Sequence, residues 1–215
     1  MRAMPCDSGD ACARELERVC HKLAAMGLGT STSGNVSARQ GDRILLTPTG
    51  VAMADVAAGA LAETGLDGRP LNNRAPTKEL PFHLAIYRGR PDVRAVLHVH
   101  PTHAIAASAF LDAARHEFLP AVTPQFVMRA GRVPTLRYFP PGDPGLADEV
   151  AGHLVHGRAL LLQNHGAVTF GVSFVEALGA LEELEENCRQ WLWVRQGGGR
   201  TLSEADVAAL LGRRM

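Results

Sequence analysis

The sequence has no excess of either charge and no apolar run long enough to cross a bilayer. Lys and Arg together number 22, as do Asp and Glu, so the formal net charge of the 215 residues is zero. No cluster of Lys or Arg stands out, which disfavours nucleic acid or an anionic membrane as a partner. Residues 1–7 lack the apolar segment of a signal peptide, and a membrane span needs about 20 apolar residues. We therefore expect a cytoplasmic protein that folds as a single domain over residues 1–215.

Cysteine is scarce, and its spacing argues against a disulfide framework. The chain has four cysteines, Cys6, Cys12, Cys20 and Cys188, and no C-x-x-C pair. Three of them fall within the first twenty residues, which is unlike a secreted scaffold. Glycine and proline, in contrast, occur 22 and 13 times and indicate many turns. This composition is typical of an α/β enzyme rich in loops.

Hydrophobic spacing predicts helices and strands in comparable number. Apolar residues three or four apart predict helices at about 8–27 and 77–87, and a long one from Ser173 to Gly197. A Gly-Asp turn near residue 41 predicts a hairpin. Further strands are expected near 60–64, 69–72, 93–99, 133–138, 159–163 and 167–170, and short helices near 53–58, 104–110, 126–130, 143–156 and 203–211. Because hairpins are as frequent as strand–helix alternation, we expect an α/β fold with a largely antiparallel sheet and helices on its faces.

The most informative stretch is His98-Val99-His100, which follows an apolar run that begins at Val93. Side chains on a strand alternate between its faces, so the two histidines point the same way. A second apolar run, at residues 160–162, also ends near a histidine, His165. Two imidazoles at one strand end can bind one metal ion, and a third after another strand completes a set typical of catalytic zinc.

Glu79 lies between these histidines in chain order and adds a carboxylate to the set. Each histidine motif alone is also typical of a buried structural residue, and only their combination favours a metal site. We expect the remaining histidines in helix-like or loop contexts to lie at the surface or its boundary; these are His21, His83, His116, His153 and His156.

A second group of residues provides small or polar pairs at turns and helix starts. The pairs are Gly34-Asn35, Thr49-Gly50 and Thr77-Lys78. Free backbone N–H groups and hydroxyls at such places can converge on an anion, and Lys78 adds a full positive charge. The alternative is ordinary turn chemistry, with Thr77 serving only as a helix cap.

Five motifs resemble, in their order along the chain, those of the class II aldolase/adducin family. The motifs are Thr32-Ser33-Gly34-Asn35-Val36-Ser37, Leu46-Thr47-Pro48-Thr49-Gly50, Thr77-Lys78-Glu79, His98-Val99-His100 and Asn164-His165-Gly166. The resemblance covers about residues 10–195. It implies a three-layer α/β/α sandwich around a mainly antiparallel sheet, and a homotetramer with active sites at subunit interfaces.

The resemblance also assigns roles to residues. It implies that His98, His100 and His165 bind zinc or another divalent ion such as Mn²⁺, Co²⁺ or Mg²⁺. Glu79 matches the carboxylate that binds the empty metal and acts as acid and base once substrate displaces it. The positions that match the phosphate pocket of a small phosphorylated substrate are Asn35, Thr49, Gly50, Thr77 and Lys78.

Within this family the chain most resembles bacterial 3-oxo-tetronate 4-phosphate decarboxylases. The residues that carry this finer resemblance are Thr77-Lys78-Glu79, Val122-Thr123-Pro124, Phe126-Val127-Met128-Arg129 and Pro141-Gly142-Asp143-Pro144. Alternatives are a fuculose-1-phosphate-type aldolase, a dehydratase of a methylthioribulose phosphate and a non-catalytic, adducin-like interaction domain. One departure is Gln125, where related aldolases commonly carry a tyrosine that acts beside a neighbouring subunit's active site.

Overall fold

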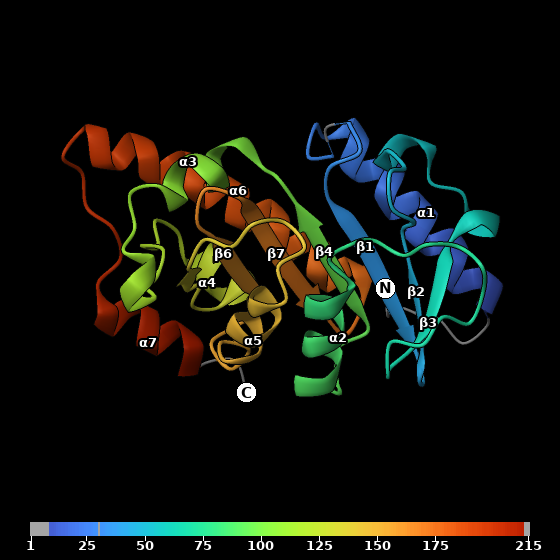
Figure 1. Ribbon diagram of the computed structural model, residues 1–215. Coiled ribbons are helices and arrows are strands. Elements are labelled where there is room, and N and C mark those ends of the chain that lie inside the picture. The colour runs from blue at the N-terminus through green and yellow to red at the C-terminus, as the bar shows by residue number, and fades with distance from the viewer. Residues whose placement is uncertain (1–8, 30, 213–215) are drawn as a thin grey trace.

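A single sheet of seven strands, in the order β3-β2-β1-β4-β7-β6-β5, forms the centre of the computed structural model (Figure 1). The structure describes residues 9–29 and 31–212. The strands are β1 (Asn35–Gln40), β2 (Arg43–Leu46), β3 (Ala62–Gly65), β4 (Ala95–Val99), β5 (Thr135–Leu136), β6 (Ala159–Leu162) and β7 (Gly166–Gly171). Every strand pair is antiparallel except β5 with β6, which is parallel. The predicted mainly antiparallel sheet is confirmed.

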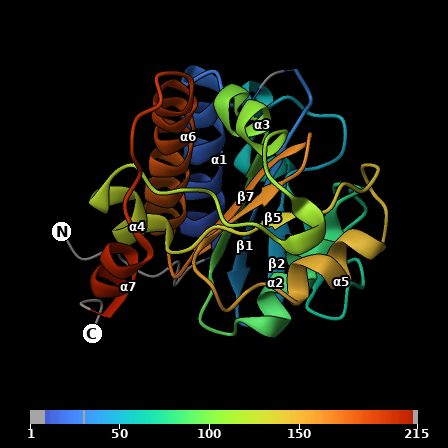
Figure 2. The same cartoon turned by 90° about the vertical axis from the view of Figure 1, so that its left-hand side faces the viewer.

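Helices cover both faces of the sheet. They are α1 (Gly9–Ala25), α2 (Leu80–Gly89), α3 (Thr102–Ser108), α4 (Pro124–Ala130), α5 (Gly145–Ala151), α6 (Phe174–Gln196) and α7 (Glu204–Gly212). Figure 2 shows α1 and α6 side by side on one face, and α2 and α5 on the other. The expected three-layer α/β/α sandwich is therefore the observed architecture.

The alternation of side chains along the strands produces two separate apolar cores. On β4, Leu97 and Val99 pack into the core under α1 and α6, whereas Val96 packs into the core under α2 and α5. Both cores are fully sealed from solvent at these positions. This two-sided burial explains why β4 reads as a continuous apolar run in which polar residues occur only near its ends.

The strand register brings distant segments to one end of the sheet. Asn35, the first residue of β1, pairs with His98 near the end of β4. On the other side of β4, Val99 pairs with Ala167 of β7. The turn between β6 and β7 contains His165. The end of β4, the start of β1 and this turn therefore meet at the same end of the strands.

Two glycines allow the backbone at this edge to approach closely. A Cβ atom on Gly34 would lie 2.7 Å from the carbonyl oxygen of His98, and Gly34 has a φ of +81°. A Cβ atom on Gly166 would lie 2.5 Å from the carbonyl oxygen of Val99 and 2.8 Å from the His100 ring. Any larger residue at either position would push the strands apart.

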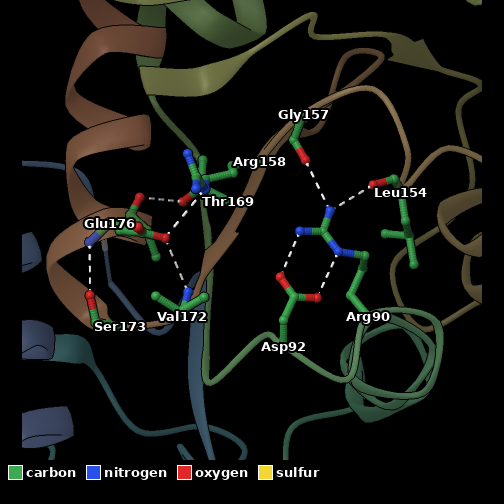
Figure 3. A network of polar contacts seen from close by, with 10 residues as sticks. Arg90, Asp92, Leu154, Gly157, Arg158, Thr169, Val172, Ser173 and Glu176 are labelled. Carbon is green, nitrogen blue, oxygen red and sulfur yellow. Dashed lines mark hydrogen bonds and ion pairs between the residues drawn. The ribbon is translucent and has the colours of Figure 1, made fainter. Parts of the chain in front are cut away.

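A polar network at the opposite end of β4 fixes the position of its start. Arg90, the residue after α2, forms two hydrogen bonds with the Asp92 carboxylate, of 2.9 and 2.8 Å. Its Nη1 also donates to the carbonyl oxygens of Leu154 and Gly157, as Figure 3 shows. Arg90 thus ties the end of α2 to the loop that follows α5. Charge-assisted bonds of this kind are stronger than neutral ones.

A second cluster in Figure 3 holds the start of α6. Ser173 accepts a hydrogen bond from the Glu176 backbone N–H at 3.3 Å, the expected N-cap. The Glu176 carboxylate accepts from the Val172 N–H at 3.2 Å and pairs with Arg158. The helix therefore begins where the sequence predicts.

Several elements differ from the sequence-based expectation. The helix expected near 53–58 consists of two short 3₁₀ turns, at Met53–Asp55 and Ala58–Ala60, and no strand forms at 69–72 among the described residues. Only an isolated bridge joins Thr64 to Pro70. Small residues and prolines offer little side-chain surface for a regular element to bury, so these segments follow the surface as turns.

Some boundaries and caps also differ. The α2 helix begins at Leu80 with Glu79 at its N-cap position and has no side-chain cap; the Thr77 hydroxyl accepts instead from the Glu79 N–H, at 3.3 Å. The predicted strand at 133–138 shortens to two residues, and the helix at 143–156 ends at Ala151. No described helix has the length and apolar character needed to span a membrane. The expectations for residues 1–7, including Cys6, lie outside the described residues.

Candidate metal centre and adjoining cavity

Three histidines converge at the edge of the sheet where β4 ends. One nitrogen of each of His98, His100 and His165 lies within 4.8 Å of one from each of the others. The Nε2 atoms of His98 and His100 are 3.0 Å apart. The predicted pairing of His98 and His100 with the distant His165 is thus present in the fold.

Glu79 completes the cluster from the residue before α2. Its Oε2 lies 3.2 Å from Nε2 of His98, and its Oε1 lies 3.6 Å from Nε2 of His165. Glu79 is 8 % exposed, so its carboxylate faces the histidines rather than bulk water. The α2 helix starts with Leu80-Pro81, so Glu79 occupies its N-cap position.

Burial keeps the imidazoles neutral. It lowers the pKa of His98 well below its ordinary value, and the neighbouring His100 and His165 lower it further. Burial is also the leading cause that lowers the pKa values of His100 and His165. Neutral imidazole is the form that binds metal ions.

The hydrogen bonds of His98 show that the cluster fits a cation. Its Nδ1 faces the carbonyl oxygen of Ala167 at 3.0 Å and must donate to it, since that oxygen can only accept. In the neutral ring Nε2 then carries a lone pair, yet it faces a carboxylate oxygen of Glu79. Two acceptors face each other without repulsion only if a positive charge lies between them.

Distances within the cluster agree with this conclusion. Two nitrogens that bind zinc tetrahedrally at 2.0–2.1 Å stand about 3.3 Å apart, close to the observed separation of the His98 and His100 nitrogens. Oε1 of Glu79 is buried and has no hydrogen-bond partner among the described residues. Three imidazoles with a nearby open position form the donor set of a catalytic rather than a structural zinc site. The residues present therefore fit a divalent metal ion.

A cavity of about 440 Å³ opens beside the histidines. All the residues expected to bind phosphate line it, together with Glu79, His100 and His165. These phosphate-pocket residues are Asn35, Thr49, Gly50, Thr77 and Lys78. His98 lies beneath the cavity floor and is fully buried. The structure thus brings every sequence-predicted site residue to one place.

The cavity lining combines groups of both charges. Lys78 is exposed and brings a positive charge to it, beside the turns at Thr49 and Thr77. Gly50 adopts a φ of +75°, the left-handed conformation in which turns expose backbone N–H groups. The same lining carries His100, His165 and the Glu79 carboxylate. A small molecule with both an anionic group and a carbonyl group matches this lining.

The sequence-based prediction gave no site role to five further residues, although all of them belong to the motifs described above. Thr32, Ser33, Thr47, Pro141 and Asn164 also line the cavity. Pro141 belongs to a loop whose Gly142 lies against Lys78, since a Cβ there would be 3.7 Å from the Lys78 Cβ. Only the fold reveals this contact, because more than sixty residues separate the two segments.

His83 contradicts the expectation of a surface histidine. It is fully buried, and its Nε2 lies 2.5 Å from Oδ1 of Asn35. The other four histidines of that group are exposed or half-buried, as expected. The spacing of His83 and Tyr87, four residues apart on one helix, was the signal that could have placed His83 on a buried face. Gln125 is exposed on α4.

Comparison with known proteins gives one consistent family. Residues 14–192 match the model of the Class II Aldolase and Adducin N-terminal domain. The 3-oxo-tetronate 4-phosphate decarboxylase of Escherichia coli (strain K12) is 34 % identical over 197 residues, which cover 91 % of this chain and 93 % of that protein. The L-fuculose phosphate aldolase of the same organism is 32 % identical over 174 residues, 80 % of this chain and 79 % of that protein.

The solved structures agree with the sequence relatives. The crystal structure of YgbL from Escherichia coli, a candidate aldolase, epimerase or decarboxylase, superposes with a TM-score of 0.88 at 33 % identity. The superposition covers 96 % of this chain and 99 % of YgbL. The shared fold therefore extends over essentially the full length of both chains.

Proposed function

The chain belongs to the class II aldolase and adducin family, and we propose that it decarboxylates a 3-oxo-tetronate 4-phosphate to dihydroxyacetone phosphate and CO₂. The decarboxylase and the aldolase relatives reported above are carbon–carbon lyases. The decarboxylase of Escherichia coli is similar over most of both chains. The observation that carries the proposal is the position of Glu79, which lies against His98 and His165 and lines the same cavity as Lys78. An adducin-like binding module would not need this arrangement.

The cavity supports a substrate held at both ends. We assign the phosphate to the end formed by Asn35, Thr49, Gly50, Thr77 and Lys78, where hydroxyls, an exposed turn and an ammonium converge. Binding energy at the phosphate then fixes the orientation of the reacting carbons near Glu79.

The histidines supply the metal requirement of the reaction. We propose that His98, His100 and His165 hold a divalent ion, zinc first by its preference for imidazole nitrogen, with Mn²⁺, Co²⁺ or Mg²⁺ as alternatives. Glu79 would be a further ligand before substrate enters. When bound, such an ion supplies Lewis-acid stabilisation of negative charge on substrate oxygens, worth several kcal/mol.

Proton transfer falls to Glu79. Decarboxylation breaks the bond between carbons 1 and 2, releases CO₂ and leaves the bonding electron pair delocalised over carbons 2 and 3 with the ketone oxygen. A proton must then reach carbon 2 to give the hydroxymethyl group of dihydroxyacetone phosphate. We assign its delivery to Oε1 of Glu79, the carboxylate oxygen without a hydrogen-bond partner among the described residues, which takes up a proton from solvent and passes it to carbon 2.

Three broader features belong to the same proposal. We propose one domain over residues 1–215, which the single continuous sheet supports. A homotetramer with active sites at subunit interfaces is supported by large apolar side chains left exposed, among them Phe110, Val175 and Trp193. A cytoplasmic location agrees with free, buried Cys12, Cys20 and Cys188.

A substrate panel tests the proposal. The purified protein is supplied with zinc, manganese, cobalt or magnesium and assayed on 3-oxo-tetronate 4-phosphate stereoisomers and on ketose 1-phosphates. We expect dihydroxyacetone phosphate and CO₂ in equal amounts from one tetronate. Release of an aldehyde from a ketose 1-phosphate without CO₂ would favour the alternative of a fuculose-phosphate-type aldolase, the activity of a relative at 32 % identity.

A further inference from the structure

A chain of buried hydrogen bonds leads from the interior of α2 to Glu79. Asn35 Nδ2 donates to Oε2 of Glu79 at 2.7 Å, and His83 Nε2 lies 2.5 Å from Asn35 Oδ1. Ser37 Oγ lies 2.7 Å from both His83 Nδ1 and the Tyr87 hydroxyl. Ser37, His83 and Tyr87 are fully buried and none of them lines the cavity.

Two periodicities bring these side chains together. Asn35 and Ser37 are two residues apart on β1, so both face the layer that contains α2. His83 and Tyr87 are four residues apart on α2 and share its inner face. Buried polar groups are costly unless paired, and each member of this chain has a partner on both sides except the terminal Tyr87.

The chemistry of the end groups gives the chain one direction. A carboxylate only accepts, so Asn35 must turn its amide nitrogen to Glu79 and its oxygen to His83. That oxygen also only accepts, and His83 therefore carries its proton on Nε2. Burial lowers the pKa of His83 to about 3, so the ring is neutral and its Nδ1 must accept from the Ser37 hydroxyl.

The chain ends at a fixed donor. Because the Ser37 proton points to His83, its oxygen accepts from the Tyr87 hydroxyl. Burial raises the pKa of Tyr87, so this phenol stays protonated. Proton positions are thus defined from Tyr87 through Ser37, His83 and Asn35 to the carboxylate.

We propose that Ser37, His83 and Tyr87 are positioning residues that lock the Asn35 amide and, through it, hold Oε2 of Glu79. Oε1 then stays free to exchange a proton with substrate. Without these residues the Asn35 amide keeps its bond to Glu79 but loses the donor that holds its oxygen, so the amide and Oε2 of Glu79 are no longer fixed in position. The inference rests on the proposed function only for the role of Glu79 in proton transfer.

Nuclear magnetic resonance of the full-length protein tests this chain of hydrogen bonds without any assay of activity. Two-bond ¹⁵N correlations of the imidazoles report which nitrogen carries the proton, and the His83→Gln variant assigns the His83 signals. We expect His83 to be neutral with its proton on Nε2 between about pH 5.5 and 8, with and without added zinc. Ser37→Ala should keep this tautomer, because Asn35 Oδ1 still accepts from Nε2–H, but it should leave Nδ1 without its donor. A proton on Nδ1, or a cationic ring in that range, would overturn the proposal.

Kinetics then separate positioning from a structural role. His83→Leu removes both hydrogen bonds, whereas His83→Gln retains a donor toward Asn35 through its amide nitrogen. We expect His83→Leu to lower kcat by about 10- to 100-fold with KM and bound metal unchanged, and His83→Gln to keep kcat within about threefold. Ser37→Ala and Tyr87→Phe, each a loss of one oxygen, should fall between them in that order.

Ile86→Val is the matched control, because Ile86 is a fully buried residue of the same helix that takes no part in the chain of hydrogen bonds. It should leave kcat unchanged, and an equal loss there would reduce His83 to a packing residue. If His83→Leu does not fold, Ser37→Ala decides, and a normal kcat in that variant contradicts the proposal. Failure of the proposed function would look different: the unaltered protein would not turn over any tetronate phosphate, while the His83 tautomer would be as expected.

Discussion

Nε2 of His98 and Nε2 of His100 lie 3.0 Å apart at the end of β4, and burial lowers the pKa of His98 so that its ring is neutral. His98 uses its Nδ1–H on the Ala167 carbonyl, so the nitrogen that faces His100 is an acceptor. The strand places both rings on one face, and the β6–β7 turn brings His165 beside them. This arrangement is a strong argument for a bound cation.

We expect His98→Ala and His165→Ala to lose bound metal and activity together. Either variant leaves two imidazoles and a carboxylate, one ligand fewer than the three-histidine set. Metal content after gel filtration, measured by mass spectrometry, checks the expectation. His103→Ala is the control, since His103 follows in the same segment but pairs with Glu185 instead. Full metal occupancy with normal turnover in either ligand variant would remove that residue from the site.

Glu79→Gln should retain the fold and the zinc but lower kcat by about 10²- to 10⁴-fold. The amide has nearly the same shape and cannot accept or deliver the proton. Circular dichroism and metal content establish that the variant is intact before its rate is measured. An unchanged kcat would show that Glu79 serves only to shape the pocket.

Lys78→Ala should raise KM for a phosphorylated substrate by about 10- to 100-fold with a smaller effect on kcat, because one charge-assisted contact is lost. The non-phosphorylated tetronate should be nearly insensitive to the change. Arg74→Ala, which removes an exposed cation outside the cavity lining, serves as the control. Equal losses on both substrates would place Lys78 at the carboxylate or in a structural role.

Gln125→Tyr should increase aldol cleavage more than it increases decarboxylation. An amide has no labile proton to give at neutral pH, whereas a tyrosine hydroxyl can act as an acid. Departing CO₂ needs no proton, but formation and cleavage of an aldol require proton transfer at an alkoxide. Both rates are measured on the same preparations. Efficient aldol cleavage by the unaltered protein would contradict the assignment of Gln125.

Glu149, on α5, should make the stability of the folded protein depend on pH. Two hydrogen bonds from the Arg137 guanidinium, at 3.0 and 2.6 Å, lower the pKa of Glu149 below its ordinary value of 4.5. Its stabilising effect is therefore complete above pH 4.5 and is lost as the pH falls through the lowered value.

Glu149→Gln should accordingly lower the melting temperature by about 2–4 °C at pH 7, a modest effect since Arg137 is more than half exposed. The difference between the variant and the unaltered protein should shrink when thermal unfolding is followed at pH 4 and below. A difference that stays constant with pH would assign the effect to packing and not to the ion pair.

Much of the fold follows from local patterns in the sequence. The α1 and α6 helices, the β1–β2 hairpin and the β6–β7 pair form where apolar spacing and turn residues predict them. The segments that deviate, at 53–60 and 69–72, are rich in alanine, glycine, proline and asparagine. Their conformation depends on which tertiary contacts are available, and no local signal states this.

Part of the site was likewise predictable from the sequence. His98, His100, His165 and Glu79 could be identified because strand periodicity and motif order point to them. For His83 the spacing to Tyr87 indicates at most a buried helix face, and its polar partners, Asn35 and Ser37 of β1, follow only from the tertiary fold. The contact of the Gly142 loop with Lys78 likewise depends on the path of the chain between distant elements.

The fate of carbon 1 tests the central claim most directly. A 3-oxo-tetronate 4-phosphate labelled with ¹³C at carbon 1 is incubated with the zinc-loaded protein in D₂O, and products are followed by NMR. Because 3-oxo acids lose CO₂ slowly by themselves, a sample without protein and one with Glu79→Gln provide the background rate.

We predict that ¹³CO₂ and dihydroxyacetone phosphate form in equal amounts, well above background, and that the new hydroxymethyl carbon carries one deuterium in a single configuration. That configuration would show delivery by a fixed group such as Glu79. Label retained in an organic product, or a release of ¹³CO₂ no faster than the background, would contradict the assignment of this protein as a decarboxylase.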